Sequence, residues 1–324
     1  MALKIEKVSN KEDNSVHTNH LHFKISGNNI DYVVVNSLRR ILLEELPGFA
    51  YDINSIKISK NSSVYNNDYL KNRIENFPVM GIDVDFNIEE FLKLKYEKDE
   101  NEIENENENE KNNLSNFNML NFYVNKVNNS DDIMNVTTND CVFFLKGNKI
   151  KNIYKNPLLI CKLKKGEELE LSAIIKKGLP IFHSKYSPIG VCYYDEINDN
   201  EFIFKVENRN QYKNKDIIIH GCDILIKRLE IVMNKIISKK FSSNNHGKII
   251  LSNENHTLGN LISRGLQENQ NIDYAAYKLD HLLINDLTIE YVTNGSKVIN
   301  EIIENVIKKQ IKLFEEIKTK IKSL

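Results

Sequence analysis

Two ten-residue stretches near opposite ends of this 324-residue chain repeat one pattern. Residues 37–46 read SLRRILLEEL, and residues 257–266 read TLGNLISRGL. The shared apolar positions are Leu38, Ile41, Leu42 and Leu46 in the first stretch and Leu258, Leu261, Ile262 and Leu266 in the second. A spacing of three and four residues is typical of one apolar face of an α-helix. The repeat therefore predicts two related structural units in one chain.

The same kinds of element surround both stretches. A short strand of alternating apolar and polar residues precedes each one, and a further strand and a long amphipathic helix follow it. The expected elements are strands at 21–25 and 202–206 with helices at 30–46 and 215–239 in the first unit, and strands at 248–251, 274–279 and 287–292 with a helix at 296–322 in the second. This mixture predicts an α+β protein.

The two units differ in one large insertion. Leu38 stands 166 residues before Phe204, whereas Leu258 stands 31 residues before Ile289, a difference of 135 residues. We therefore expect a mostly β insert domain at 51–195. The expected organisation is a first dimerisation module at 1–50 and 196–240, the insert, a polar linker at 241–247, and a second module at 248–324.

Each unit alone would leave its apolar helix stripe exposed to water. Two homologous units can bury these stripes against each other about a pseudo-two-fold axis, as the two halves of a symmetric dimer do. The sequence therefore predicts an intramolecular pseudo-dimer. The residues expected at its interface are Leu38, Ile41, Leu42, Leu225, Leu229, Val232, Leu258, Leu261, Ile262, Ile303 and Val306.

Charge is balanced overall but segregated along the chain. The 44 Lys and Arg against 45 Asp and Glu give a net charge of −1, which argues against bulk electrostatic binding of nucleic acid. Residues 81–110 are strongly acidic and residues 146–188 strongly basic, a pattern that fits a charged docking face for a larger partner. Residues 97–113 contain almost no apolar side chain, so we expect a disordered acidic loop there.

Several classes of protein are disfavoured by simple criteria. No apolar run approaches the roughly 18 residues of a membrane-spanning helix, and the first residues lack the apolar core of a secretory signal. The four cysteines, Cys141, Cys161, Cys192 and Cys222, contain no closely spaced pair. We therefore expect reduced thiols, no metal site, no cofactor and a cytoplasmic protein.

Four motifs, taken in order, resemble the alpha-type assembly subunits of multisubunit RNA polymerase; one of them is the stretch at 53–64 and 66–73, which ends in Phe77-Pro78-Val79. Residues 36–47 are similar to the NxLRRxLLxxxP helix of bacterial alpha, of its archaeal counterpart and of the third subunit of eukaryotic polymerase II. Residues 176–178 and 183–188 are similar to the KKG…HAKWSP motif, with Tyr186 in place of Trp. Residues 256–261 and 275–281 resemble the HTLGNLL…AGYKxPHP signature of the smaller partner, which is the eleventh subunit of polymerase II or its archaeal counterpart.

The resemblance implies a fusion of two assembly subunits, as occurs in large cytoplasmic DNA viruses. Such a chain is a non-catalytic platform for the two large catalytic subunits and small subunits, meets DNA only through the complex, and needs neither a membrane nor a homodimer. Its location would be cytoplasmic, in a viral factory or virion, with the nucleus as the alternative. By motif matching, the residues that would face the large subunits are Asn36, Arg39, Arg40, Lys177, His183, Lys185 and Tyr186.

Two other functions stay open at the level of sequence. Cys192 lies nine residues after His183, which would suit a thiol-dependent hydrolase if the two side chains met. The lysine-rich stretch at 146–188 would suit a stand-alone nucleic-acid-binding protein.

Overall fold

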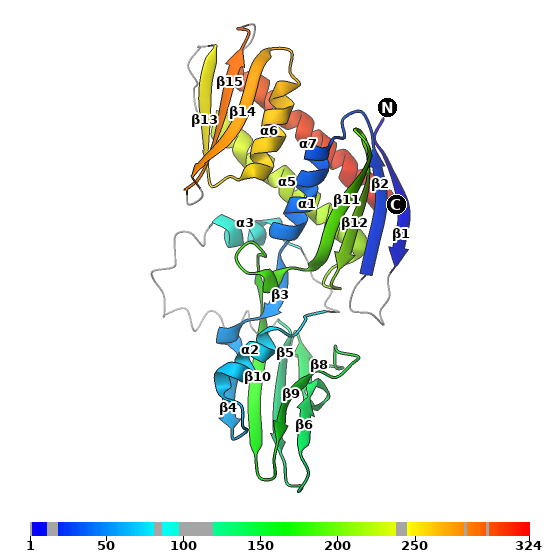
Figure 1. Ribbon diagram of the computed structural model, residues 1–324, viewed down its shortest axis with the longest axis vertical. Coiled ribbons are helices and arrows are strands. Elements are labelled where there is room, and N and C mark those ends of the chain that lie inside the picture. The colour runs from blue at the N-terminus through cyan, green and yellow to red at the C-terminus, as the bar shows by residue number, and fades with distance from the viewer. Residues whose placement is uncertain are drawn as a thin grey trace.

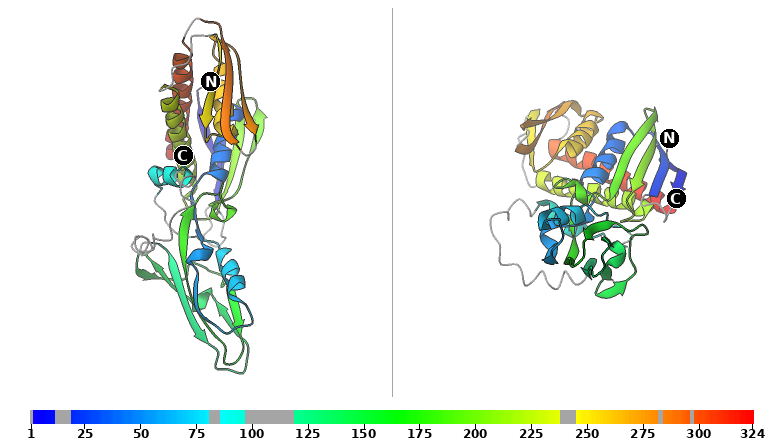
Figure 2. Two further views of the ribbon diagram at one scale, coloured as in Figure 1. Left: turned by 90° about the vertical axis from the view of Figure 1, so that its left-hand side faces the viewer. Right: turned by 60° about the horizontal axis from the view of Figure 1, so that its bottom comes forward.

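The computed structural model describes residues 2–11, 19–80, 86–96, 119–237, 245–281, 284–295 and 298–324. The molecule is elongated, with the two expected modules side by side at one end and the insert extending from them (Figures 1 and 2). The acidic stretch expected to be disordered, 97–113, lies outside the described residues.

The first module is a four-stranded antiparallel sheet covered by two helices. The strand order is β1-β2-β12-β11. Their bounds are Lys4–Lys11 for β1, Asn19–Ser26 for β2, Glu201–Asn208 for β12 and Ile189–Asn198 for β11. Alternate residues of β2 and β12 are buried, so Phe23 and Phe204 stack at 5.3 Å beneath the helices. The two helices are α1, Tyr32–Glu44, and α5, Asn214–Ile237.

The second module repeats this plan with three strands. The order is β13-β15-β14, all antiparallel. The strands are β13, His246–Ser252, β14, Ile272–His281, and β15, Ile284–Thr293. Its helices are α6, His256–Gln267, and α7, Ile299–Ser323. The helices and strands expected from periodicity are therefore confirmed in both modules.

The two modules share one hydrophobic core. α1 packs against α5 and α6, and α7 packs against α5 and α6, so four helices form the contact between the modules (Figure 1). Leu38 and Leu258, the central residues of the two repeated stretches, are both buried in this core. The intramolecular pseudo-dimer expected from the repeat is confirmed.

The helices approach closely where glycine removes a side chain. A Cβ atom on Gly221 of α5 would stand 2.6 Å from Leu42 of α1, and one on Gly265 of α6 would stand 2.5 Å from Val306 of α7. Both distances are shorter than a carbon–carbon contact allows. Glycine at these two positions therefore permits the close packing of α5 on α1 and of α6 on α7.

The insert is strand-rich and has a core of its own. One sheet runs β3-β10-β5-β7-β8 with β4 also paired to β10, and β6 pairs with β9. The strands are β3 (Gly48–Tyr51), β4 (Lys57–Asn61), β5 (Asn121–Val127), β6 (Met134–Thr137), β7 (Val142–Leu145), β8 (Asn148–Ile150), β9 (Leu159–Leu163) and β10 (Glu168–Gly178). Helix α2, Asn67–Glu75, packs on this part.

Three features near the expected boundaries differ from the sequence-based expectation. β11 falls within the range expected for the insert, yet it pairs with β12 because Ile189 and Cys192 belong to the core of the modules. Helix α3, Ile88–Tyr96, also falls in that range but packs on α5 through the fully buried Phe91. β1 was not expected from the sequence.

None of the helices in the described part of the chain is both long enough and apolar enough to cross a membrane.

Candidate assembly interface

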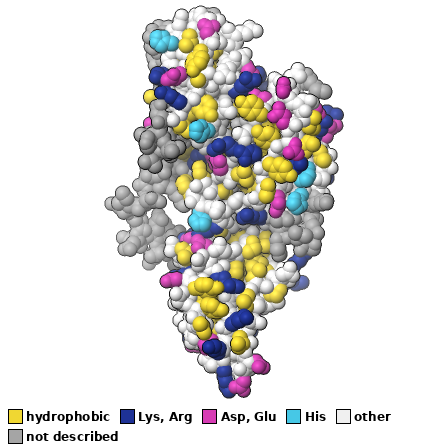
Figure 3. Space-filling view, in the orientation of Figure 1, with side chains coloured by type: hydrophobic (Ala, Val, Ile, Leu, Met, Phe, Trp, Pro, Cys, Tyr) yellow, Lys and Arg dark blue, Asp and Glu magenta, His cyan; other side chains and the backbone are white. Residues whose placement is uncertain are grey.

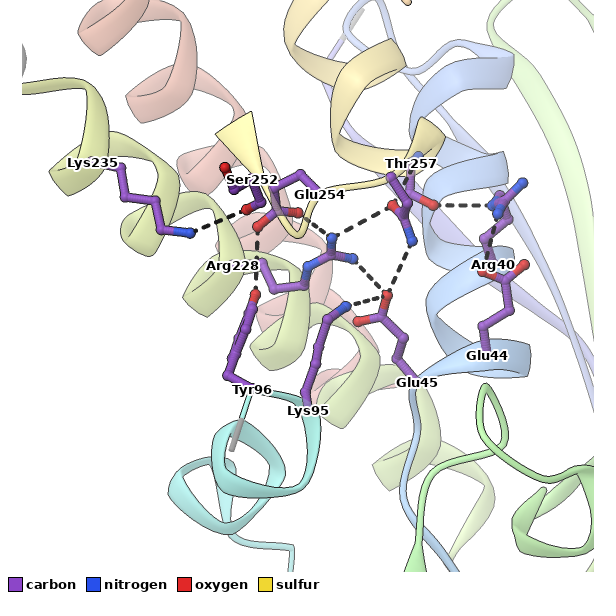
Figure 4. A network of polar contacts seen from close by, with 11 residues as sticks. Arg40, Glu44, Glu45, Lys95, Tyr96, Arg228, Lys235, Ser252, Glu254 and Thr257 are labelled. Atoms are coloured by element: carbon purple, nitrogen blue, oxygen red, sulfur yellow. Dashed lines mark hydrogen bonds and ion pairs between the residues drawn. The ribbon is translucent and has the colours of Figure 1, made fainter. Parts of the chain in front are cut away.

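A buried cluster of charged side chains lies where both modules meet α3. Arg228 of α5 lies between Glu45, which follows α1, and Glu254, which precedes α6 (Figure 4). Lys95 and Tyr96 at the end of α3 complete the cluster. We call these five residues the charge centre. It joins the first module, the second module and α3.

The contacts of the charge centre pair each cation with a carboxylate. One guanidinium nitrogen of Arg228, Nη1, donates to Glu45 Oε1 at 2.7 Å, and the other, Nη2, donates to Glu254. Lys95 Nζ lies 2.7 Å from the same oxygen of Glu45, and the Tyr96 hydroxyl donates to Glu254 Oε1 at 3.4 Å. Two cations thus face two carboxylates. The side chains of Arg228 and Glu254 are 0% exposed and that of Glu45 is 1% exposed, so water does not screen these pairs.

Burial and the neighbouring charges act in opposite directions on these groups. Burial alone would raise the pKa of Glu45, but Arg228 and Lys95 outweigh it and hold that pKa below its ordinary value of 4.5. Burial would lower the pKa of Arg228, and the two carboxylates instead raise it. Burial, followed by the charge of Arg228, lowers the pKa of Lys95. The neighbouring charges thus favour the ionised forms of Glu45 and Arg228, and each of these two groups depends on its partners in the centre.

Local backbone structure positions the carboxylates. Glu45 is the C-cap residue of α1, and its backbone N–H donates to Ile41 O at 2.9 Å. Asn255 is the N-cap residue of α6 and accepts from the Thr257 backbone N–H at 3.1 Å, which places Glu254 at the entrance to the helix. The ends of two helices thus fix where each acid meets Arg228.

Two more polar contacts join the modules near the surface. Arg40 Nε of α1 donates to Thr257 Oγ1 of α6 at 3.0 Å. Arg264 Nε of α6 donates to Asp31 Oδ2, the N-cap residue of α1, at 3.2 Å. The N-terminal end of each helix therefore meets the C-terminal part of the other, as an antiparallel pair about a pseudo-two-fold axis requires.

The residues predicted at the pseudo-dimer interface lie together. All of them are 5% exposed or less, and all belong to the core that both modules share. They are Leu38, Ile41, Leu42, Leu225, Leu229, Val232, Leu258, Leu261, Ile262, Ile303 and Val306.

The predicted docking residues fall into two groups. On α1, Arg39 Nε donates to Asn36 Oδ1 at 2.9 Å, so these two side chains form a small polar unit on the partly exposed side of the helix. Arg40, beside them, is also held by Glu44 at 3.0 Å and by Thr257 of the second module. Arg40 therefore supports the pairing of the modules in addition to any contact outside the chain.

The second group lies in and beside the turn that follows β10. Lys177 Nζ lies 2.6 Å from Glu90 of α3 and is 6% exposed, and Lys185 pairs with Glu75 and Asp52 and is 10% exposed. Both charges are used inside the chain, so the structure gives these two lysines an internal role. His183 is exposed and its Nδ1 accepts from the backbone N–H of the same Lys185.

Tyr186 explains the glycine of the KKG motif. A Cβ atom on Gly178 would stand 2.6 Å from the ring of Tyr186, and one on Gly48 would stand 2.0 Å from the Tyr186 carbonyl oxygen. Tyr186 therefore covers two glycines where the insert leaves the first module, and it anchors the turn.

The charge centre was not predicted from the sequence. Arg228 stands one position before Leu229, in a helix that is apolar on most sides. A charged residue flanked by core positions was the available sign of a buried ion pair. Glu254 gave no signal, because its partner lies on another element and no sequence rule links the two.

The structure offers no support for the two alternative functions. Cys192 is buried in the module core, and burial raises its pKa to about 12, whereas a nucleophilic thiol needs a lowered pKa. Lysines of the basic stretch are engaged by acids of the same chain: Lys165 by Asp131, Lys176 by Asp52 and Lys177 by Glu90. Within the described ranges, no group of three or more His, Cys, Asp or Glu side chains is placed to hold a metal ion.

Comparison with known protein families agrees with the paired modules. Models described as the RNA polymerase Rpb3/Rpb11 dimerisation domain match residues 24–229 and residues 246–320. The chain belongs to this family. The first match covers more than half of the chain and includes the insert, and the second covers the second module. The resemblance to polymerase assembly subunits that the motifs indicate is confirmed.

Relatives of this family differ in how much of the chain they share. A putative DNA-directed RNA polymerase subunit of Acanthamoeba polyphaga mimivirus, R470, is 23% identical over 316 residues, 89% of this chain and 87% of the relative. The RNA polymerase II subunit RPB3 of Schizosaccharomyces pombe is 28% identical over 182 residues, 53% of this chain and 57% of its own length. The polymerase subunit Rpo11 of Sulfolobus acidocaldarius is 38% identical over 52 residues, 16% of this chain and 58% of its own length. The viral relative thus matches this chain along most of its length.

Proposed function

We propose that this chain is the non-catalytic assembly subunit of a viral DNA-dependent RNA polymerase, and that it supplies in one polypeptide the pair of modules on which the two large catalytic subunits assemble. The observation that carries the proposal is the pairing itself: two Rpb3/Rpb11 dimerisation domains bury one common core. The near full-length viral relative supports the viral setting. We place the protein in the cytoplasm, in a viral factory or virion, with the nucleus as the alternative, and its contact with DNA is through the complex.

A surface over α1 and β11 has the composition of a protein-binding site. Basic side chains gather over α1 and apolar side chains lie beside them over β11 (Figure 3). Protein interfaces favour arginine and exposed apolar or aromatic anchors of this kind. We define the docking face by its members, which are Asn36, Arg39 and Arg40 of α1, Ile181 and Phe182 of the turn after β10, and Val191 and Tyr193 of β11.

The docking face is held by the backbone. The N–H of Ile181 donates to the carbonyl oxygen of Glu44 at 2.8 Å, so the turn after β10 is tied to the last turn of α1. The guanidinium of Arg39 is a planar donor that suits carboxylate or carbonyl groups of a partner. We infer that a large subunit binds here through Arg39 and the apolar anchors together.

Charge reversal at Arg39 tests the proposal. The Arg39 side chain donates to Asn36 within the same helix, so Arg39→Glu should leave the melting temperature within about 2 °C of the wild type, because surface changes are usually small. Arg40→Glu is a poorer probe because Arg40 also contacts Thr257 of the second module.

The measurement is co-purification of the two large subunits with the tagged chain after co-expression. We expect Arg39→Glu to reduce their recovery at least about tenfold. Lys308→Glu, a charge reversal on the exposed side of α7, is the matched control and should recover them normally. Normal recovery with Arg39→Glu would show that the docking face has been assigned wrongly.

A further inference from the structure

The charge centre occurs on one side of the pseudo-two-fold axis only. α5 and α7 share one spacing of core positions, in which Leu225 corresponds to Val306, so Arg228 corresponds to Lys309. In the alignment of the repeated stretches, Glu254 corresponds to Val34, because α1 begins about one turn earlier than α6. Arg228 thus has another cation as its counterpart, and Glu254 has an apolar residue.

The counterparts build no buried ion pair. The side chain of Lys309 is 59% exposed and lies 3.6 Å from Glu268 at the surface. Val34 is buried and apolar. In the alignment of the repeated stretches, Gly265 corresponds to Glu45. The pseudo-equivalent position therefore has neither the buried cation nor the buried acids.

This asymmetry matters because both modules belong to one dimerisation family. A module that pairs with a relative could also pair with a second copy of itself, in a second molecule of this chain. In a first-module self-pair, Arg228 would face Val34 of the other copy in place of Glu254. Each site would then hold Arg228 and Lys95 beside Glu45, and Arg228 would lose the buried carboxylate of Glu254 that it binds in the native pairing.

The centre already contains polar atoms that lack a hydrogen-bond partner. Even in the native pairing, Arg228 Nε and Glu45 Oε2 are buried and have no hydrogen-bond partner among the residues that the structure describes. Losing one partner of a buried ion pair shifts an equilibrium by about a hundredfold or more. A self-pair would carry this cost at both of its equivalent sites.

We propose that the Arg228–Glu254 contact selects the pairing of this chain: it directs the first module to the second and rejects a second copy of the first module. Residues that only fill the core, such as Leu38 and Leu258, are apolar in both modules and cannot make this distinction. The selection acts by excluding the wrong partner as well as by binding the right one. It rests on the pairing of the modules, whichever surface a large subunit binds.

The test must remove the tether, because a short linker raises the effective concentration of the second module and hides any preference. We would place a protease site between residues 240 and 245, purify the intact protein, and cut it. The two fragments are then left to exchange partners until equilibrium. Native mass spectrometry counts the pairs of a large fragment with a small one and the pairs of two large fragments.

The informative variant is Arg228→Met with Glu254→Leu, which makes the crossing contact apolar while Glu45 keeps Lys95. We expect the cut wild type to give mixed pairs only and the double variant to raise the self-paired large fragment at least about tenfold. Arg264→Gln, which removes a partly exposed contact between the modules, is the control and should behave as the wild type.

Two results would overturn the proposal. One is a self-paired large fragment in the cut wild type at the level of the mixed pair. The other is a double variant that pairs as selectively as the wild type. If the double variant does not fold, Glu254→Gln replaces it, because it keeps the shape and removes the charge, and it should raise self-pairing severalfold. Recovery of the large subunits by the uncut chain, measured separately, reports on docking and not on this selection.

Discussion

Arg228→Met is the substitution that most directly tests the energetics of the charge centre. Met has a similar length and no charge, so the change removes the cation without opening a large space. Glu254 would then keep the Tyr96 hydroxyl at 3.4 Å, and Glu45 would keep Lys95 at 2.7 Å. One buried carboxylate therefore loses its positive partner. Breaking a buried pair in this way costs about 3–5 kcal/mol.

The loss should be visible in thermal and chemical unfolding of the paired modules. For a cooperative unit of about this size, each kcal/mol lowers the melting temperature by about 2–4 °C. We expect a decrease of about 10 °C for Arg228→Met. The double variant Arg228→Met with Glu254→Leu leaves no unpaired acid, so it should regain most of the lost melting temperature. The coupling energy between the two substitutions should be about 2 kcal/mol or more. Arg264→Gln, at a partly exposed pair, should cost less than about 1 kcal/mol.

The pH dependence gives the sign of the effect. Because the pKa of Glu45 is lower in the folded chain than its ordinary 4.5, its contribution to stability is present above pH 4.5 and is lost as the pH falls through the folded value. Without Arg228, the Glu45 carboxylate keeps Lys95 alone, so part of this contribution is already lost. The difference between Arg228→Met and the wild type should therefore be largest at neutral pH and shrink towards pH 4. A cost below about 1 kcal/mol at pH 7, or a difference that grows in acid, would refute the reasoning.

Three further predictions concern packing and thiols. Gly221→Val should destabilise the chain by about 1–3 kcal/mol in urea unfolding, because its side chain would overlap Leu42 across α5 and α1. Gly178→Ala should cost about the same through the ring of Tyr186, and adding Tyr186→Ala should make the double variant less damaging than the sum of the single ones. Cys192, with its pKa raised to about 12, should react with a disulfide reagent only after unfolding, and rapid labelling of the native protein would contradict its burial.

Most of the paired core could be predicted because it depends on periodicity. Apolar residues three and four apart identify α1, α5 and α7, and the repeat between residues 37–46 and 257–266 identifies the pairing. These signals are local, or are comparisons of the chain with itself. They do not require knowledge of which elements meet in space.

The parts that could not be predicted depend on contacts between distant elements. α3 lies in a region that reads as acidic surface, yet Phe91 is fully buried on α5. β11 reads as part of the insert, but hydrogen bonding to β12 places it in the first module. Lys177 and Lys185 are assigned to docking by motif matching alone. The sequence does not show their partners inside the chain, Glu90 and Glu75, which lie 87 and 110 residues away.

The charge centre also links the pairing of the modules to the shape of the docking face. Glu45 is fixed by Arg228 and Lys95, and it directly follows Glu44, whose carbonyl oxygen holds the turn that carries Ile181 and Phe182. At the C-terminal end of α1, the buried Glu45 carboxylate is therefore held in the charge centre, and the Glu44 carbonyl oxygen is bound by the turn after β10. Because Glu254 of the second module shares Arg228 with Glu45, the position of that helix end depends on the presence of the second module. We therefore expect a partner that binds the proposed docking face to recognise a chain whose two modules are already paired.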